Sequence, residues 1–99
     1  MPQVARTVEL TSLASSEDSV AEWLREAMRQ PAEPPGLKAM FALRDAADEH
    51  RFVLVSIFTD ARAMEANTAG LQTALTAIRP ALSRDPLIQW YELLADELS

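Results

Sequence analysis

Apolar positions repeat along the chain with two different periods. Short alternating or continuous apolar segments, typical of β-strands, occupy residues 4–11, 37–43, 52–59 and 88–94. Between the first and second segments, and between the third and fourth, apolar residues recur three or four positions apart and predict α-helices. The order β-α-β-β-α-β is that of an α+β ferredoxin-like antiparallel sheet, in which right-handed crossovers place both helices on one face. We expect one such domain, 1–99.

Local signals mark the ends of the first helix. Ser15 and Asp18 have the spacing of a capping box, so we expect the helix to start there. Its apolar stripe comprises Val20, Trp23, Leu24, Ala27 and Met28. The helix is stopped by three prolines, Pro31, Pro34 and Pro35. Gly36 then allows the backbone to turn into the next strand.

The second helix is predicted to be broken. Asp60 has the position of its N-cap, and Met64 and Leu71 define its buried face. Poor helix formers interrupt this face at Asn67, Thr68 and Gly70. We therefore expect a kink or a break there, after which the helical spacing continues to Pro80.

The connection between the second and third strands, residues 44–51, is predicted to be a polar turn. Its charged or titratable side chains include Asp45, Asp48, Glu49 and His50. Such residues are typical of solvated turns, and we favour this interpretation over a cation site. His50 lies outside any predicted pocket, so we do not expect it to act as a general base.

Both faces of the third strand are apolar. One face carries Phe52, Leu54 and Phe58, and the other carries Val53, Val55 and Ile57. A single layer of helices covers one face of a sheet, so the other face of a lone chain would expose a large apolar patch. We therefore expect a homodimer in which two sheets pack face to face.

Composition narrows the classes of function. The net charge is −6, there is no cysteine, and the one histidine is His50. These features exclude a Cys/His zinc site and a cysteine nucleophile, and the acidic balance argues against nucleic acid as a partner. With glycine only at positions 36 and 70, the chain has no phosphate-binding glycine loop. We expect no metal and no cofactor.

The same sequence gives an expectation about membranes. No apolar run approaches the roughly 20 residues of a membrane span. The first six residues lack the basic and apolar segments of a signal peptide. We therefore expect no membrane partner and a cytoplasmic location, with which the absence of cysteine agrees.

Asn67 is the candidate catalytic residue. It lies three positions after Met64 and four before Leu71, on the helix face that turns toward the sheet, where a buried amide needs a hydrogen-bond partner. In the functional interpretation it donates to a substrate carbonyl or to a developing oxyanion, with Leu71 as a ligand contact. In the structural interpretation, which we favour, it caps the helix at the break.

Aromatic side chains are candidate walls of a pocket between the helices and the sheet. Trp23 lies on the buried stripe of the first helix, where it serves either the core or a ligand. Phe41 and Phe58 are expected in the core, at the edge of such a pocket. Trp90 and Tyr91 are adjacent on a strand and face opposite ways, so one should meet the helices and the other the dimer interface.

Arg6 is a candidate ligand contact for a different reason. It shares a strand face with Val8 and Leu10, and an arginine on an apolar face needs a carboxylate partner or a ligand anion. Glu9 and Glu92 are available in the predicted sheet to pair with basic residues. We favour structural pairing over the binding of a ligand anion.

Four segments resemble one known family. They are the step Pro35–Gly36, the run Arg51–Phe58, the segment Thr59–Asn67, and Asp85–Pro86 followed by Tyr91–Glu92. In order and spacing, over nearly the whole chain, they are similar to the antibiotic biosynthesis monooxygenase (ABM) group of dimeric α+β barrel proteins. The resemblance implies a ferredoxin-like sheet that forms a homodimeric α+β barrel.

The resemblance also implies candidate activities. One is a cofactor-independent monooxygenase that binds an electron-rich aromatic or polyketide-like phenolate and lets it react with oxygen. Asn67 would then stabilise the oxygen charge, and Trp23 and Phe58 would shape the pocket. The alternatives are a non-catalytic dimer that binds a small molecule in the same pocket, and a non-redox isomerase or cyclase on this fold.

The chain departs from the pattern of this group at two positions. Phe58 stands where many relatives have Trp, and Asn67 stands where relatives often have His. The heme-degrading branch also needs an iron-binding histidine in the region that here contains Thr76–Ile78. We therefore expect no specific binding of heme.

Overall fold

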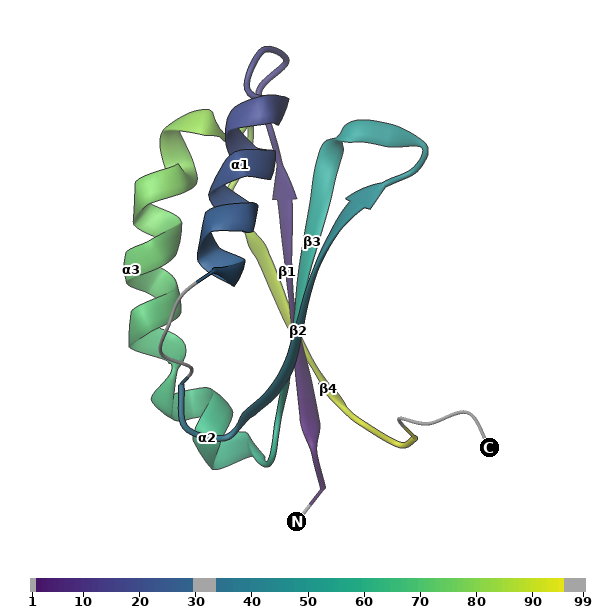
Figure 1. Ribbon diagram of the computed structural model, residues 1–99, viewed down its shortest axis with the longest axis vertical. Helices are drawn as coiled ribbons and strands as arrows, with labels where there is room; N and C mark the ends of the chain where they lie inside the picture. Colours follow the sequence, from purple (N-terminus) through teal and green to yellow (C-terminus); the bar gives the residue numbers. More distant parts are fainter. Residues whose placement is uncertain (1, 30–33, 96–99) are drawn as a thin grey trace.

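The computed structural model describes residues 2–29 and 34–95. In these ranges, helices lie on one face of a four-stranded antiparallel sheet with the strand order β2-β3-β1-β4 (Figure 1). The elements are β1 (Val4–Thr11), α1 (Glu17–Met28), β2 (Leu37–Asp45), β3 (Asp48–Phe58), α2 (Ala61–Ala66), α3 (Thr68–Ile78), the short helix η1 (Arg79–Ala81) and β4 (Leu87–Glu92). The predicted α+β ferredoxin-like fold is confirmed.

The register of the sheet decides which side chains face the helices. Arg6 on the central strand β1 lies opposite Ser56 on β3 and Trp90 on β4. Residues paired across antiparallel strands share a face. Val8 and Leu10 lie on the same face of β1 as Arg6 and are at most 1% exposed, so this face is the one that the helices cover.

Several boundaries of the second, third and fourth strands differ from the prediction. The predicted turn over residues 44–51 is much tighter, because β2 continues to Asp45 and β3 begins at Asp48. Asp45 accepts a hydrogen bond from the backbone N–H of Ala47, and Asp48 accepts one from that of His50, so the polar residues stabilise a short turn. The last strand spans Leu87–Glu92 rather than residues 88–94, since Glu92 already pairs with the first residue of β1.

The signals for the helices are confirmed in part. Asp60 caps α2, because its carboxylate accepts a hydrogen bond of 2.9 Å from the N–H of Ala63. The predicted break is present, since Asn67 separates α2 from α3. The capping box is wrong: α1 begins at Glu17, so Ser16 takes the N-cap position, and its side chain makes no cap hydrogen bond. Pro31 lies outside the described residues.

Gly36 fixes the start of β2 against the first turn of α2. Its φ is +82°, and a Cβ atom here would lie 2.5 Å from the Cβ of Ala63 and 3.0 Å from the Oγ1 of Thr59. Its carbonyl oxygen accepts a hydrogen bond of 2.9 Å from the N–H of Thr59. Both the left-handed backbone and the close approach require glycine, as the sequence predicts.

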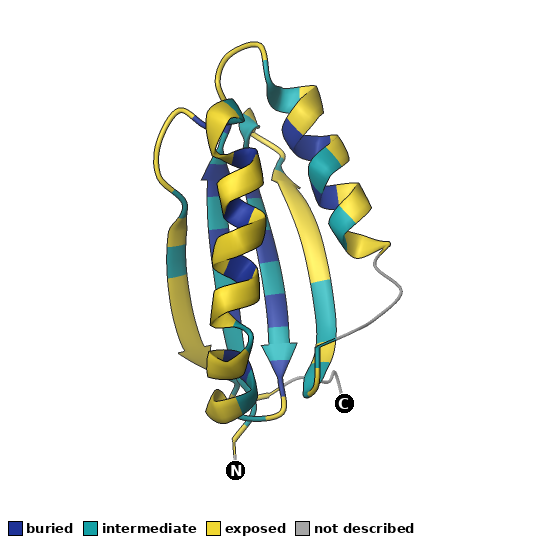
Figure 2. Cartoon of the chain, turned by 90° about the vertical axis from the view of Figure 1, so that its left-hand side faces the viewer, coloured by how far each residue is buried: buried dark blue, intermediate teal, exposed yellow. Residues whose placement is uncertain are grey.

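The core lies between α1, α3 and the covered face of the sheet (Figure 2). The buried residues form one cluster: Val8, Leu10, Val20, Ala21, Leu24, Phe52, Leu54, Leu71, Leu75, Ile78 and Leu82. Figure 2 also shows that the edge strand β4 has no helix directly over it. No helix in the described part of the chain is long and apolar enough to cross a membrane.

The other face of the sheet has no helix over it in the described ranges (Figure 1). Phe41 pairs with Val55 and Leu43 with Val53, so all four share this open face. Phe41 and Leu43 are 50% and 52% exposed. The prediction that Phe41 is a core residue is therefore wrong within a single chain, because the helices cover the opposite face of its strand.

Candidate functional site

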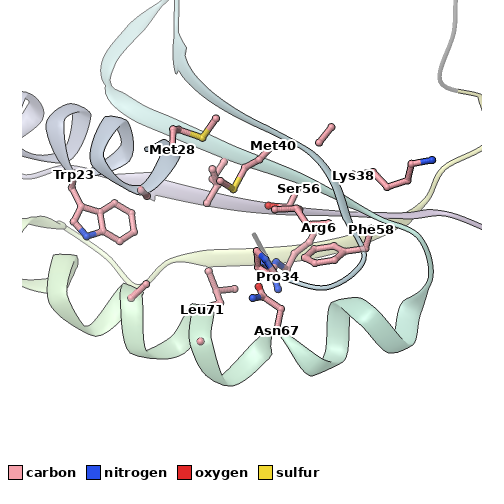
Figure 3. Close-up of a pocket in the computed structure, with 16 residues that line it drawn as sticks. Arg6, Trp23, Met28, Pro34, Lys38, Met40, Ser56, Phe58, Asn67 and Leu71 are labelled. Atoms are coloured by element: carbon pink, nitrogen blue, oxygen red, sulfur yellow. Dashed lines mark hydrogen bonds between the residues drawn. The ribbon is translucent and has the colours of Figure 1, made fainter. Parts of the chain in front are cut away.

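A cavity of about 370 Å³ lies between the covered face of the sheet and the helix layer (Figure 3). Its walls come from β1, β2 and β3 on one side, and from α1, α3 and the junction before α3 on the other. The larger apolar side chains that line it are Trp23, Met28, Leu37, Met40, Leu54, Phe58 and Leu71. The cavity is thus mostly apolar, which is typical of small-molecule sites.

The polar groups of the cavity gather at one end. Figure 3 shows Arg6, Asn67 and Phe58 together, with Trp23 at the opposite end and Leu71 between. The Nη2 of Arg6 donates a hydrogen bond of 2.8 Å to the Oδ1 of Asn67. The cavity therefore has an aromatic, apolar end and a positively charged end.

Arg6 is held from two sides. In addition to its bond to Asn67, its guanidinium carbon lies 5.1 Å from the centre of the Phe58 ring, a cation–π contact. Arg6 is only 4% exposed. Burial lowers the pKa of the guanidinium, but an arginine stays protonated in proteins, so the positive charge is retained.

The favoured prediction, that Arg6 forms a structural ion pair, is wrong for the described part of the chain. Among the described residues its Nε and Nη1 have no hydrogen-bond partner, and no carboxylate pairs with it. Glu9 lies three positions further along the strand and so faces the opposite side. There it accepts a bond of 2.7 Å from Arg51, and Glu92 is exposed at the end of β4.

Asn67 has the capping position that the sequence favoured, because it is the C-cap of α2 and the N-cap of α3, but its side chain does not act as a cap. The side chain makes no cap hydrogen bond to α3. The amide oxygen is used by Arg6 instead. The break in the helix thus directs this half-buried amide into the cavity, beside the buried cation.

Three of the sequence candidates lie away from the cavity. Its described lining includes Arg6, Trp23, Phe58, Asn67 and Leu71, but not Phe41, Trp90 or Tyr91. Tyr91 pairs with Ala5 on the open face, whereas Trp90 faces the helix side. Trp90 is nevertheless 65% exposed, because the edge strand that carries it is not covered.

Sequence reasoning missed Ser56 and Met40 as cavity residues. Both line the cavity and pair with each other across β2 and β3. Alternation along β3 carried the signal for Ser56, which shares a face with Phe52, Leu54 and Phe58. A serine between apolar residues on a buried strand face indicates a polar position beneath the helices.

A second polar cluster surrounds His50. Its Nδ1 lies 3.2 Å from the Oγ of Ser12 and 3.6 Å from a carboxylate oxygen of Glu17. The other ring nitrogen, Nε2, lies 3.7 Å from a carboxylate oxygen of Glu49, which is too far for the hydrogen bond that a nucleophile–base–acid relay needs. None of these four residues lines the cavity, and the described residues contain no cluster suited to hold a metal ion.

No protein-family model matches the chain, and a search of curated proteins finds no match. Solved structures do match. The NE2512 protein from Nitrosomonas europaea, a protein of unknown function, is 30% identical with a TM-score of 0.86, over 100% of this chain and 96% of that chain. This similarity shows that the two chains belong to one family.

Two further solved structures have names that describe an activity. A protein from Nitrosomonas europaea that is provisionally named an antibiotic biosynthesis monooxygenase is 20% identical, with a TM-score of 0.80 over 93% of this chain and 90% of that chain. SnoaB, a cofactor-independent oxygenase from Streptomyces nogalater, is 16% identical, with a TM-score of 0.79 over 97% of each chain. They confirm the ferredoxin-like fold of the chain that the sequence resemblance implied.

Proposed function

We propose that this chain, which belongs to the family of the NE2512 protein and has the antibiotic biosynthesis monooxygenase fold, is a cofactor-independent monooxygenase for an aromatic or polyketide-like small molecule. The observation that carries the proposal is the cavity of about 370 Å³ with an apolar end at Trp23 and a polar end at Arg6 and Asn67. Small-molecule sites commonly combine apolar walls with a few convergent polar groups.

The chemistry requires a substrate that supplies its own electrons. In one such reaction, a ring CH₂ group conjugated to a phenol loses a proton, and the resulting anion passes electrons to dioxygen. One oxygen atom forms a new carbonyl on that carbon, and the other leaves as water with the two hydrogens. The substrate is oxidised by four electrons and dioxygen is reduced by four.

Asn67 suits the task of stabilising negative charge on oxygen. Arg6 has only N–H donors, so its bond fixes the amide with Oδ1 toward Arg6. The N–H donors of Nδ2 are then on the other branch of the amide, which Figure 3 shows turned away from Arg6. A preorganised donor of this kind stabilises the charge that develops on oxygen during reaction.

The second candidate function is a non-catalytic protein that binds a small molecule in the same cavity. One observation favours it: the described lining residues include no carboxylate and no histidine that would remove a proton. No observation on the described residues favours an isomerase or cyclase over these two functions. The two remaining functions differ in whether bound ligand consumes oxygen.

We also propose that the active form is a homodimer. Phe41, Leu43 and Tyr91 are each about half exposed on the open face. Patches of this kind are typical of interfaces, and a second sheet packed on this face would cover them. The cytoplasmic location stays a prediction from the sequence.

The variant Asn67→Ala tests whether Asn67 takes part in the proposed reaction. If Asn67 stabilises charge in the reaction, turnover falls by about 100-fold while the melting temperature changes little. If its bond to Arg6 is only structural, stability falls by about 1 kcal/mol and turnover of folded protein is retained.

The assay follows oxygen uptake with a panel of polycyclic phenols and quinols. Thr68→Ala is the matched control, because Thr68 is the neighbouring exposed residue and does not line the cavity. A wild-type protein that consumes no oxygen with any substrate it binds would exclude the oxygenase and leave the binding protein.

A further inference from the structure

Arg6 places a positive charge at the wall of the cavity, and no group among the described residues compensates it. It is 4% exposed, and its Nε and Nη1 have no hydrogen-bond partner among the described residues. Within the described ranges it donates one hydrogen bond, to the neutral amide of Asn67, and its guanidinium lies over the ring of Phe58. Neither group cancels the charge. A buried cation is costly unless an anion accompanies it, and the described part of the site contains no such anion.

The charge of the cavity contrasts with that of the chain. The charged side chains among its described lining residues are Arg6 and Lys38, which are both positive, although the net charge of the chain is −6. Figure 3 shows the ammonium group of Lys38 directed away from Arg6. The fixed charge inside the cavity is therefore that of Arg6, and it favours an anionic ligand.

The position of Arg6 also defines how such a ligand would lie. Arg6 is at one end of the cavity, and Trp23 is at the other, with Leu71 between them (Figure 3). A ligand that satisfies both ends has an anionic oxygen at one end of a flat apolar body. Such an oxygen would supply the counter-charge that Arg6 lacks, since the buried Nε and Nη1 have no hydrogen-bond partner among the described residues.

We propose that the cavity selects an aromatic monoanion, whose anionic oxygen accepts hydrogen bonds from Arg6 and whose rings extend toward Trp23. The inference rests on the proposed function only in taking this cavity as the ligand site. A carboxylate and a phenolate share the required chemistry. For a phenolate, the charge of Arg6 favours the ionised form, so the electron-rich anion is held without a carboxylate or histidine base in the described lining.

The first experiment compares two ligands of almost equal shape. Naphthoate carries a carboxylate, and naphthamide carries a neutral amide in its place. By calorimetry at neutral pH, naphthoate should bind the wild-type protein about 10- to 100-fold more tightly than naphthamide, as expected of a charge-assisted hydrogen bond. Arg6→Met should remove this preference, whereas Arg6→Lys should retain part of it.

Arg44→Met is the matched control. Arg44 also lies over a phenylalanine ring, 4.9 Å from the centre of Phe52, but it is exposed and outside the cavity. The control should keep the full preference for naphthoate. A melting curve of each variant establishes that it is folded before ligand is added.

The second experiment needs no variant and tests the phenolate. A nitronaphthol changes colour when it ionises, so its pKa can be read from absorbance in the bound and free states. Binding beside Arg6 should lower that pKa by about 1 to 3 units. A lowered pKa without a preference for naphthoate identifies a phenolate site, and the reverse result identifies a carboxylate site.

The failures are distinguishable. If naphthoate and naphthamide bind equally and the pKa of nitronaphthol does not fall, the cavity binds neutral ligands: the anion is refuted and the proposed function stands. If none of the three probes binds the wild-type protein, the cavity is not an aromatic ligand site and the proposed function fails as well.

Discussion

On the covered face of the sheet, Val8, Leu10 and Phe52 are at most 2% exposed, whereas on the open face Phe41 and Leu43 are about half exposed. Both faces are therefore built from large apolar residues, and they differ in what lies over them. The helices cover one face and leave the other available to a second sheet.

Charges are distributed over the two faces in opposite ways. On the open face, Glu9 and Asp45 both pair with Arg51, with bonds of 2.7 Å and 2.9 Å. On the covered face, Arg6 has no anionic partner among the described residues. A buried charge beside a cavity, with no anionic partner in the described part of the chain, favours the proposed ligand site, whereas an apolar patch with paired charges at its margin is typical of an assembly surface.

The largest expected effect concerns the open face. Val55→Glu places a carboxylate at the centre of this face, where β3 pairs with both β2 and β1. Burying that charge between two sheets would weaken association by several kcal/mol, or at least about 100-fold. Sedimentation at micromolar concentration should change from twice the chain mass of 10.9 kDa to a single chain.

Gln72→Glu is the control for Val55→Glu, since Gln72 is exposed on α3 and the same charge there should leave the mass unchanged. A wild-type protein that sediments as a monomer would contradict the assignment of the open face to assembly.

The second prediction compares leucine truncations on the two faces in the monomeric Val55→Glu background. Leu75→Ala removes a fully buried side chain and should cost about 2–5 kcal/mol of unfolding free energy. Leu43→Ala removes a side chain that is 52% exposed and should cost less than about 1 kcal/mol. Urea denaturation measures both. Equal losses would show that the open face is not open in the single chain.

The third prediction concerns the unpaired charge. Arg6→Met removes a buried cation and keeps an apolar side chain, so the unfolding free energy should rise by about 1 kcal/mol and the melting temperature by about 4–8 °C. Arg44→Met, which removes an exposed arginine, should stay within about 0.5 kcal/mol of wild type. A clear loss of stability in Arg6→Met would identify Arg6 as a structural residue.

The smallest effect comes from the paired charges of the open face. The hydrogen bond from Arg51 lowers the pKa of Glu9, and the N–H of Ala47, followed by Arg51, lowers the pKa of Asp45. Carboxylates with a lowered pKa contribute stability above their unfolded pKa values of about 4, and this contribution is lost as the pH falls through the folded values.

Denaturation of wild type and Glu9→Gln at neutral pH and at about pH 3 measures this contribution, and the loss on acidification should be smaller in the variant. Glu65→Gln, an exposed substitution on α2, is the control and should lose as much as wild type. An equal loss in Glu9→Gln would show that the pair contributes nothing to acid sensitivity.

Local patterns predicted most of the fold, because each of its elements has its own signal. The alternation of side chains along a strand predicted which residues of β1 and β3 share a face. Asp60 predicted the N-cap of α2, and Gly36 predicted the turn into β2. The poor helix formers before Leu71 located the break between α2 and α3. These features depend on residues close together in the sequence, where propensity and spacing decide the outcome.

The candidate site was predicted less well, because its contacts join distant segments. Arg6 and Asn67 were both candidates, but their bond spans 61 positions and depends on where the helix layer lies over the sheet. The exposure of Trp90 has the same cause. The sequence left open whether Trp90 or Tyr91 faces the helices, and in the structure Trp90 does. It is exposed because the helices do not extend over the edge strand, and no pattern in the sequence shows that.

The central position of β1 has a consequence for the order of folding. This strand is synthesised first, yet its neighbours in the sheet are β3 (Asp48–Phe58) and β4 (Leu87–Glu92). Pairings between such distant segments form slowly, since a long loop must close, at a cost in conformational entropy, before the first stabilising contact forms. During synthesis, β1 therefore has no partner strand until β3 has been made. A chain that stops before Leu87 leaves one edge of β1 open to pairing with other molecules.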